Sequence, residues 1–172
     1  MKKVLFSLIA LMAVMTVQAQ SICSTWRSMQ PVVETDDDGS FTVQHFTYTF
    51  YDNGTYSLVD EVTIASEPAQ TMALEVATNV SVKGTYTLND KKLTLTPDKN
   101  SYKTELISIS KNGRVVNDSK VKTNVNTKVN SNDFKSKFLG VESATVRIGE
   151  YSLDMTKNGK TANYVRMATI KE

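Results

Sequence analysis

The sequence predicts an all-β protein, an antiparallel sandwich or barrel of many short strands. After residue 19 the chain contains 20 threonines and 16 valines, whose branched side chains suit a pleated strand better than a helix. Apolar and polar residues alternate along several segments, and Asn-Gly pairs separate some of them. A length of 172 residues is typical of one domain with a short leader.

The first 19 residues have the layout of a secretory signal peptide. Two lysines precede the apolar run of residues 4–14, and residues 17–19 place β-branched and small side chains at positions −3 and −1 of a cleavage site. That run is shorter than the roughly 20 residues of a membrane-spanning helix. We therefore expect cleavage after Ala19, export to the periplasm or the extracellular space, and a mature domain of residues 20–172 without a transmembrane segment.

Loss of this leader would bring the net charge from +2 to zero, with 18 basic and 18 acidic residues remaining. We expect no nucleic-acid partner, because such binding requires a clustered excess of Lys and Arg. Charge is nevertheless uneven: residues 20–98 hold 4 basic and 11 acidic residues, whereas residues 99–137 hold 9 and 3. This asymmetry fits either mutual attraction of solvated strands or a surface for an anionic partner.

Alternation predicts strands over residues 45–51, 55–64 and 80–88. One face of each segment is mainly aromatic and aliphatic, and the other carries mostly polar side chains such as Thr, Ser and Lys. A further strand around Leu93 is expected to end at Pro97, because proline cannot donate to a sheet ladder.

Turn residues lie between these segments. Asn-Gly pairs occur at residues 53–54, 112–113 and 158–159, and we expect each to form a type I′ hairpin turn, whose two central residues need positive φ. Further turns are predicted at Asp38-Gly39 and Asn89-Asp90.

Residues 121–129 leave two alternatives open. Valine recurs at every fourth position, which suits a helical stripe, but threonines fill the gaps and make every second residue β-branched. Because such a pattern disfavours a helix, we predict a strand here. Residues 132–139 are expected to form one short helix, capped by Ser131 or Asn132.

Few of the residue sets that catalysis and metal binding need are present. His45 is the only histidine and Cys23 the only cysteine, and we expect a surface histidine and a free, buried cysteine beside the first strand. The acidic run of residues 36–38 lacks the glutamate that ends a calcium loop, so we interpret it as a turn. Asp60 and Glu75 interrupt apolar strands, but no nucleophile and base accompany them. We expect no enzyme activity, no cofactor and no metal.

The only tryptophan, Trp26, opens the first strand, and Arg166 lies in the last. Between them stands an aromatic-x-x-Asn-Gly-Thr-Tyr motif at residues 50–56. This layout resembles the lipocalin-like (calycin) barrels, especially the small secreted bacterial ones, over residues 23–167. That family has Gly-x-Trp on its first strand, with Ser24 in place of the glycine here, and an arginine packed across the Trp ring. The resemblance implies that Trp26 and Arg166 stack where the barrel closes.

The resemblance implies an antiparallel up-and-down β-barrel of about eight strands. It also implies a monomeric binding protein whose barrel interior holds a small apolar or amphipathic molecule. The inward faces of the predicted strands would supply the ligand-binding residues Phe46, Tyr48, Phe50, Tyr56, Leu58, Val62, Tyr86 and Leu88. The alternative is a protein-interaction or inhibitor module that binds a macromolecule through loops at the barrel mouth. A cavity of about 300 Å³ or more inside the barrel favours the first hypothesis, and a filled interior favours the second.

Overall fold

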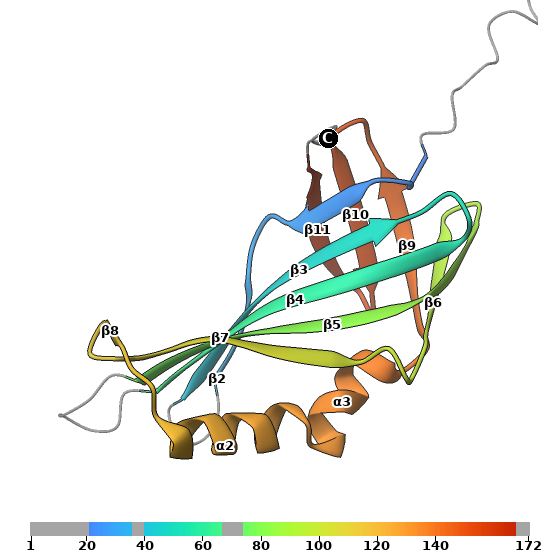
Figure 1. Ribbon diagram of the computed structural model, residues 1–172. Coiled ribbons are helices and arrows are strands. Elements are labelled where there is room, and N and C mark those ends of the chain that lie inside the picture. Colours follow the sequence, from blue (N-terminus) through green and yellow to red (C-terminus); the bar gives the residue numbers. More distant parts are fainter. Residues whose placement is uncertain (1–20, 36–39, 67–73, 168–172) are drawn as a thin grey trace, which may run out of the picture.

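Antiparallel strands make up most of the structure, a computed structural model that describes residues 21–35, 40–66 and 74–167 (Figure 1). The strands are β1 (Thr25–Ser28), β2 (Val32–Thr35), β3 (Phe41–Phe50), β4 (Thr55–Ser66), β5 (Leu74–Asn89), β6 (Lys92–Pro97), β7 (Lys103–Lys111), β8 (Arg114–Val115), β9 (Glu142–Ile148), β10 (Ser152–Lys157) and β11 (Lys160–Arg166). Helices α2 (Ser119–Val129) and α3 (Asn132–Leu139) connect β8 to β9. The predicted signal peptide and the predicted turn at Asp38-Gly39 lie outside the described residues.

Eight strands close into an antiparallel barrel, which confirms the predicted fold class. The closing strand is β1, which pairs with β3 on one side and with β11 on the other. Trp26 pairs with Arg166 in this ladder, and the guanidinium carbon lies 4.8 Å from the centre of the Trp ring. Such a contact is worth roughly 0.5–2 kcal/mol. The stacking that the resemblance implies is therefore present, on a tryptophan that is fully buried.

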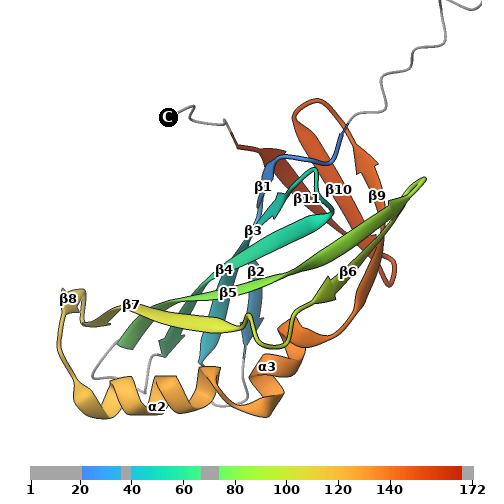
Figure 2. The ribbon, with the colours of Figure 1, turned by 45° about the vertical axis from the view of Figure 1, so that its right-hand side comes forward.

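Two long strands change partners along their length. β3 pairs with β1 through residues 47–49 and with β2 through residues 41–44. β5 pairs with β6 through residues 84–89 and with β7 through residues 74–81. The sheet therefore closes into a ring at one end of the molecule, which we call the closed end. Beyond the ring the sheet is open and consists of β2, β3, β4, β5, β7 and β8. Helices α2 and α3 lie beneath that second end, which we call the helix end (Figures 1 and 2).

Helix α2 shows that the prediction of a strand over residues 121–129 is wrong. Asp118 caps the helix by accepting a hydrogen bond from a first-turn backbone N–H at 3.0 Å. Two threonine hydroxyls donate to carbonyls four residues earlier, so these β-branched residues are satisfied within the helix. Val125 and Val129 pack against the barrel core. Burial of this stripe outweighs the strand propensity of the individual residues.

Helix α3 confirms the predicted short helix, and Ser131 is its N-cap. The Ser131 hydroxyl accepts a hydrogen bond from the backbone N–H of Phe134 at 3.2 Å. Phe134 and Phe138 are buried and belong to the same core as the barrel strands. The hydroxyl of Tyr102, the residue before β7, donates to the carbonyl oxygen of Val129, the last residue of α2, at 2.5 Å. This hydrogen bond connects the end of α2 to the start of β7.

The Asn-Gly turns at residues 112–113 and 158–159 have positive φ at both positions, as the sequence predicts. The type I′ prediction is wrong at the first pair, where only Gly54 has positive φ. There the Asn53 side chain accepts the backbone N–H of Thr55 at 3.0 Å, and this local bond supports a longer connection between β3 and β4. Asp90 has positive φ in the turn before β6, and Pro97 ends that strand.

Gly84 lies where β5 passes from β7 to β6. An added Cβ would overlap the Thr96 carbonyl oxygen and lie 2.8 Å from both Pro97 Cα and Tyr56 Cε1. We expect Gly84→Ala to lower the free energy of unfolding by about 1–3 kcal/mol in urea denaturation, because backbone or ring atoms must move. Gly140→Ala is the control, since its Cβ would lie 3.8 Å from the nearest atom. Equal losses in the two variants would contradict this assignment.

Candidate functional site

The barrel interior is filled at the closed end and hollow towards the helix end. At the closed end, the Phe50 ring packs against Tyr56 and Tyr86, with ring centres 6.3 and 5.1 Å apart. Ile22 and Trp26 are buried in the same core. Farther along lie two adjoining cavities of about 560 and 360 Å³. Each exceeds the volume of about 300 Å³ at which small-molecule sites begin.

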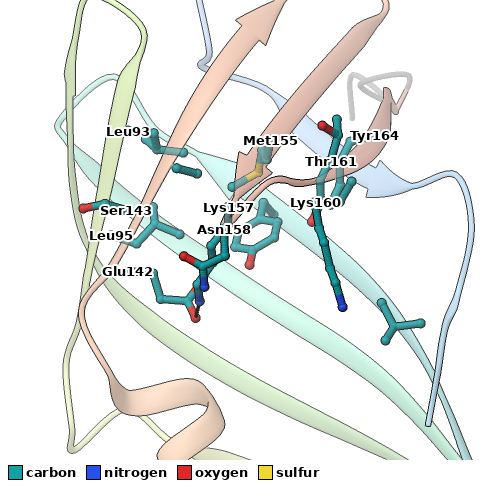
Figure 3. Close-up of a pocket in the computed structure, with 14 residues that line it drawn as sticks. Leu93, Leu95, Glu142, Ser143, Met155, Lys157, Asn158, Lys160, Thr161 and Tyr164 are labelled. Atoms are coloured by element: carbon teal, nitrogen blue, oxygen red, sulfur yellow. Dashed lines mark hydrogen bonds and ion pairs between the residues drawn. The ribbon is translucent and has the colours of Figure 1, made fainter.

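The larger cavity lies between β6, β9, β10 and β11, with Val32 of β2 at its edge (Figure 3). Its wall is mainly apolar and includes Leu93, Leu95, Ala144, Met155 and Ala162. The turn between β10 and β11 contributes Lys157, Asn158 and Lys160, which are exposed to solvent. The cavity therefore reaches the molecular surface at this turn.

The smaller cavity extends towards α3. Gln44, Phe46 and Leu58 border it from β3 and β4, and Lys137 and Phe138 border it from α3. The two cavities have a common wall, which we call the shared wall, formed by Val32, Tyr48, Leu95, Glu142 and Tyr164. A ligand longer than either cavity would have to cross this wall.

Two ion pairs lie at the edges of the cavities. Lys157 Nζ is 2.5 Å from Glu142 Oε1, and Lys137 Nζ is 2.8 Å from Glu34 Oε2. The second pair joins α3 to β2 beside the smaller cavity. Lys160 forms no ion pair with any residue that the structure describes, and it lies across the larger cavity from Glu142 (Figure 3).

Half of the predicted lining residues border a cavity. Phe46, Tyr48, Tyr56 and Leu58 do so. The other four fill the core instead: Phe50 and Val62 are fully buried, and Tyr86 and Leu88 are partly buried against it. Alternation identifies which side chains point inward. Which part of the interior they fill, and which part stays hollow, depends on pairings between strands that are distant in sequence.

Sequence reasoning missed the part of the wall that comes from α3 and from the strands after it. Glu142, Met155, Lys137 and Tyr164 belong to this part. The alternation of Leu153, Met155 and their polar neighbours along β10 is a signal that could have indicated inward positions. Nothing in the sequence pattern of residues 132–139 indicates that α3 lies beside the smaller cavity.

Asp60 is buried inside the barrel and is bonded to a cavity residue. Its Oδ2 accepts a hydrogen bond from Gln44 Nε2 at 2.5 Å, while its Oδ1 has no hydrogen-bond partner among the described residues. Burial raises the pKa of Asp60 to about 7; Glu61 and Glu34 add to the rise, and the Gln44 hydrogen bond and Lys137 oppose it. The carboxyl is therefore partly protonated near neutral pH.

This buried carboxyl makes stability depend on pH. Between pH 4 and 7 the folded protein holds a proton that the unfolded chain has released, so stability falls by up to about 1.4 kcal/mol per pH unit and levels off above pH 7. Asp60→Asn keeps an acceptor for Gln44 without a charge. We expect its free energy of unfolding to match the wild type at pH 4 and to exceed it at pH 8, measured by urea denaturation.

Glu75→Gln, a change at an exposed carboxylate on β5, is the matched control and should leave the pH profile of the wild type in place. A difference between Asp60→Asn and the wild type that is the same at pH 4 and pH 8 would contradict the role of Asp60.

Three buried tyrosines border the cavities, and two of them, Tyr48 and Tyr164, belong to the shared wall. Tyr48, Tyr56 and Tyr164 are 7%, 4% and 5% exposed, and the Tyr48 and Tyr164 rings meet edge to face at 5.7 Å between centres. Burial raises the pKa of Tyr56 and of Tyr164 to about 12, and the nearby Glu142 carboxylate adds to both shifts. Burial likewise raises the pKa of Tyr48 well above its usual value. All three are neutral phenols at physiological pH.

Cys23 and His45 lie away from this site. The prediction that Cys23 is buried is wrong: it is free and exposed beside β1, and its Sγ lies 3.3 Å from the Tyr86 hydroxyl. Cys23 lies between Ile22 and Trp26, and these two neighbours take the buried positions instead. His45 is partly buried and lies on the strand face opposite the inward Gln44 and Phe46.

Neither helix of residues 21–35, 40–66 and 74–167 is long and apolar enough to cross a membrane. In the same residues, His, Cys, Asp and Glu side chains form no group of three that could hold a metal ion.

No protein-family model matches this sequence, and no curated protein matches it. An antiparallel barrel occurs in several families with different functions. The lipocalin-like assignment therefore rests on the residues at the barrel closure and is carried forward as a proposal.

Proposed function

We propose that this chain is an exported, lipocalin-like protein that binds a small apolar or amphipathic molecule inside its barrel. The observation that carries the proposal is the pair of adjoining cavities of about 560 and 360 Å³ at the end where the barrel opens. Such volumes are typical of small-molecule sites, in which apolar walls carry a few polar groups. Export is inferred from the signal-peptide pattern of residues 1–19.

The groups around the cavities are suited to binding rather than to catalysis. The tyrosines are neutral, and the two glutamates at the rim are each paired with a lysine. Apolar side chains such as Leu95 and Met155 supply most of the remaining wall. We propose binding without a cofactor, by a monomer, because the cavities lie within one chain.

Family membership is supported by the contact that the resemblance implies. Arg166 packs across the buried Trp26 ring at the point where β1 and β11 join. The macromolecule-binding alternative rests on the loops at the barrel mouth, of which residues 36–39 lie outside the described part. The cavities favour the small-molecule hypothesis.

A cavity-filling variant tests the proposal. Ala144 borders the larger cavity, so Ala144→Phe should occupy its space. We expect the mature wild type to bind the uncharged probe N-phenyl-1-naphthylamine saturably in a fluorescence titration, and Ala144→Phe to bind it about 10-fold or more weakly.

Val115→Phe is the matched control, because Val115 is 76% exposed on β8, and it should bind the probe like the wild type. Thermal unfolding checks that both variants are folded. Absence of saturable binding by the wild type, or equal binding by the two variants, would contradict a ligand site in this cavity.

A further inference from the structure

We infer that the polar head of the ligand is an uncharged group that both donates and accepts hydrogen bonds, a hydroxyl or an amide, held by Tyr48, Tyr56 and Tyr164. This inference rests on the proposed function and specifies the chemistry of the same site. It places the head inside the barrel, at the shared wall, and the apolar part of the ligand in the larger cavity.

The three phenol groups supply donors that the protein leaves unused. Tyr48 and Tyr164 border both cavities, and Tyr56 borders the smaller one. All three side chains are more than nine-tenths buried, and no hydrogen bond to another described residue occupies their hydroxyls. These hydroxyls are not among the buried polar atoms that lack a partner, so they face the cavity space, where water or a ligand can reach them. A ligand atom that accepts hydrogen bonds would satisfy them.

The same region also presents acceptors. Gln44 borders the smaller cavity, and its Nε2 is committed to Asp60, which leaves the carbonyl oxygen Oε1 for a ligand. Glu142 borders both cavities, and its Oε1 is paired with Lys157, which leaves Oε2. A hydroxyl or an amide can accept from the phenols and donate to these oxygens at the same time.

The charges around the shared wall disfavour an anionic head. A carboxylate here would lie near Glu142, with Glu34 and the buried Asp60 also on this side of the barrel. The two nearest lysines are already paired with Glu34 and Glu142, so neither is available to neutralise a further negative charge. Lys160 stands at the exposed edge of the larger cavity, where water solvates it.

An ammonium head also fits poorly. It has no lone pair, so it cannot accept the hydrogen bonds that the three tyrosines offer. Transfer of its charge from water into this largely apolar interior would be unfavourable without a close carboxylate partner, and Glu142 is already shared with Lys157. Only an uncharged head forms hydrogen bonds both with the tyrosine hydroxyls and with the free oxygens of Gln44 and Glu142.

The apolar part of the ligand has a continuous surface to contact. From the shared wall, Leu95 leads to Leu93, Ala144 and Met155 in the larger cavity. A linear chain of several carbons attached to the head would therefore lie along β6, β9 and β10, and would run from Leu95 and Glu142 towards Leu93 and Met155 (Figure 3).

Three probes with the same eight-carbon chain test the head group. Octan-1-ol, octanoate and octylammonium are each titrated at pH 7.5 against mature protein preloaded with N-phenyl-1-naphthylamine, and displacement is followed by fluorescence. We expect octan-1-ol to displace the fluorophore at a concentration about 10-fold lower than either ion. A preference for octanoate or for octylammonium, or no preference, would overturn the inference.

Removal of single hydroxyls tests the placement of the head. Tyr48→Phe and Tyr164→Phe should each weaken octan-1-ol binding by about 2- to 10-fold, after displacement is corrected for the affinity of each variant for the fluorophore. Tyr151→Phe, at a tyrosine that is 67% exposed, is the matched control and should change neither. Tyr56→Phe gives a further hydroxyl deletion if one of the others fails to fold.

Unchanged octan-1-ol affinity in the folded Tyr→Phe variants would overturn the placement of the head, even if the wild type binds the fluorophore well. Failure of the wild type to bind the fluorophore at all would instead overturn the proposed function. The two failures are therefore distinguishable in one set of titrations.

Discussion

The unequal lengths of neighbouring strands determine where this barrel is closed and where it is hollow. β3, β4 and β5 have 10, 12 and 16 residues, whereas β1 and β6, which close the barrel against them, have 4 and 6. The long strands must therefore find other partners, β2 and β7, beyond the point of closure. Because these partners do not pair with one another, the sheet stays open there, and helices α2 and α3 cover only part of the gap (Figure 2).

The chemistry of the interior follows from this boundary. Where the barrel is closed, aromatic rings such as Phe50 pack against one another and leave little space. Where it opens, Tyr48 and Tyr164 present an apolar ring to the core and a hydroxyl to the cavity, a position for which tyrosine is well suited. Asp60 lies in the same half of the barrel with one oxygen unpaired, and it remains there at the expense of stability near neutral pH. Perturbed and unsatisfied polar groups of this kind cluster at binding sites more often than elsewhere.

Local patterns predicted the features that depend on local physics. Alternation gave the inward faces of β3, β4 and β5, and the Ser131 cap marked the start of α3. The stacking of Arg166 on Trp26 came from the family resemblance. Residues 121–129 were assigned wrongly because the burial of Val125 and Val129 against the barrel, which a local pattern does not contain, decides in favour of a helix. The cavities escaped prediction for the same reason: their position depends on which strands pair with each half of β3 and β5, and on contacts between α3 and β6 that are distant in sequence.

The central claim is that the open half of the barrel holds one small, uncharged amphipathic molecule. Native mass spectrometry of the mature protein purified from its own source tests this claim most directly, followed by organic extraction of the same sample. We expect a complex heavier than the bare chain by the mass of one small molecule, and the extract to contain that molecule with a hydroxyl or amide group. Only the mass of the bare chain under gentle ionisation, with an empty extract, would contradict the account.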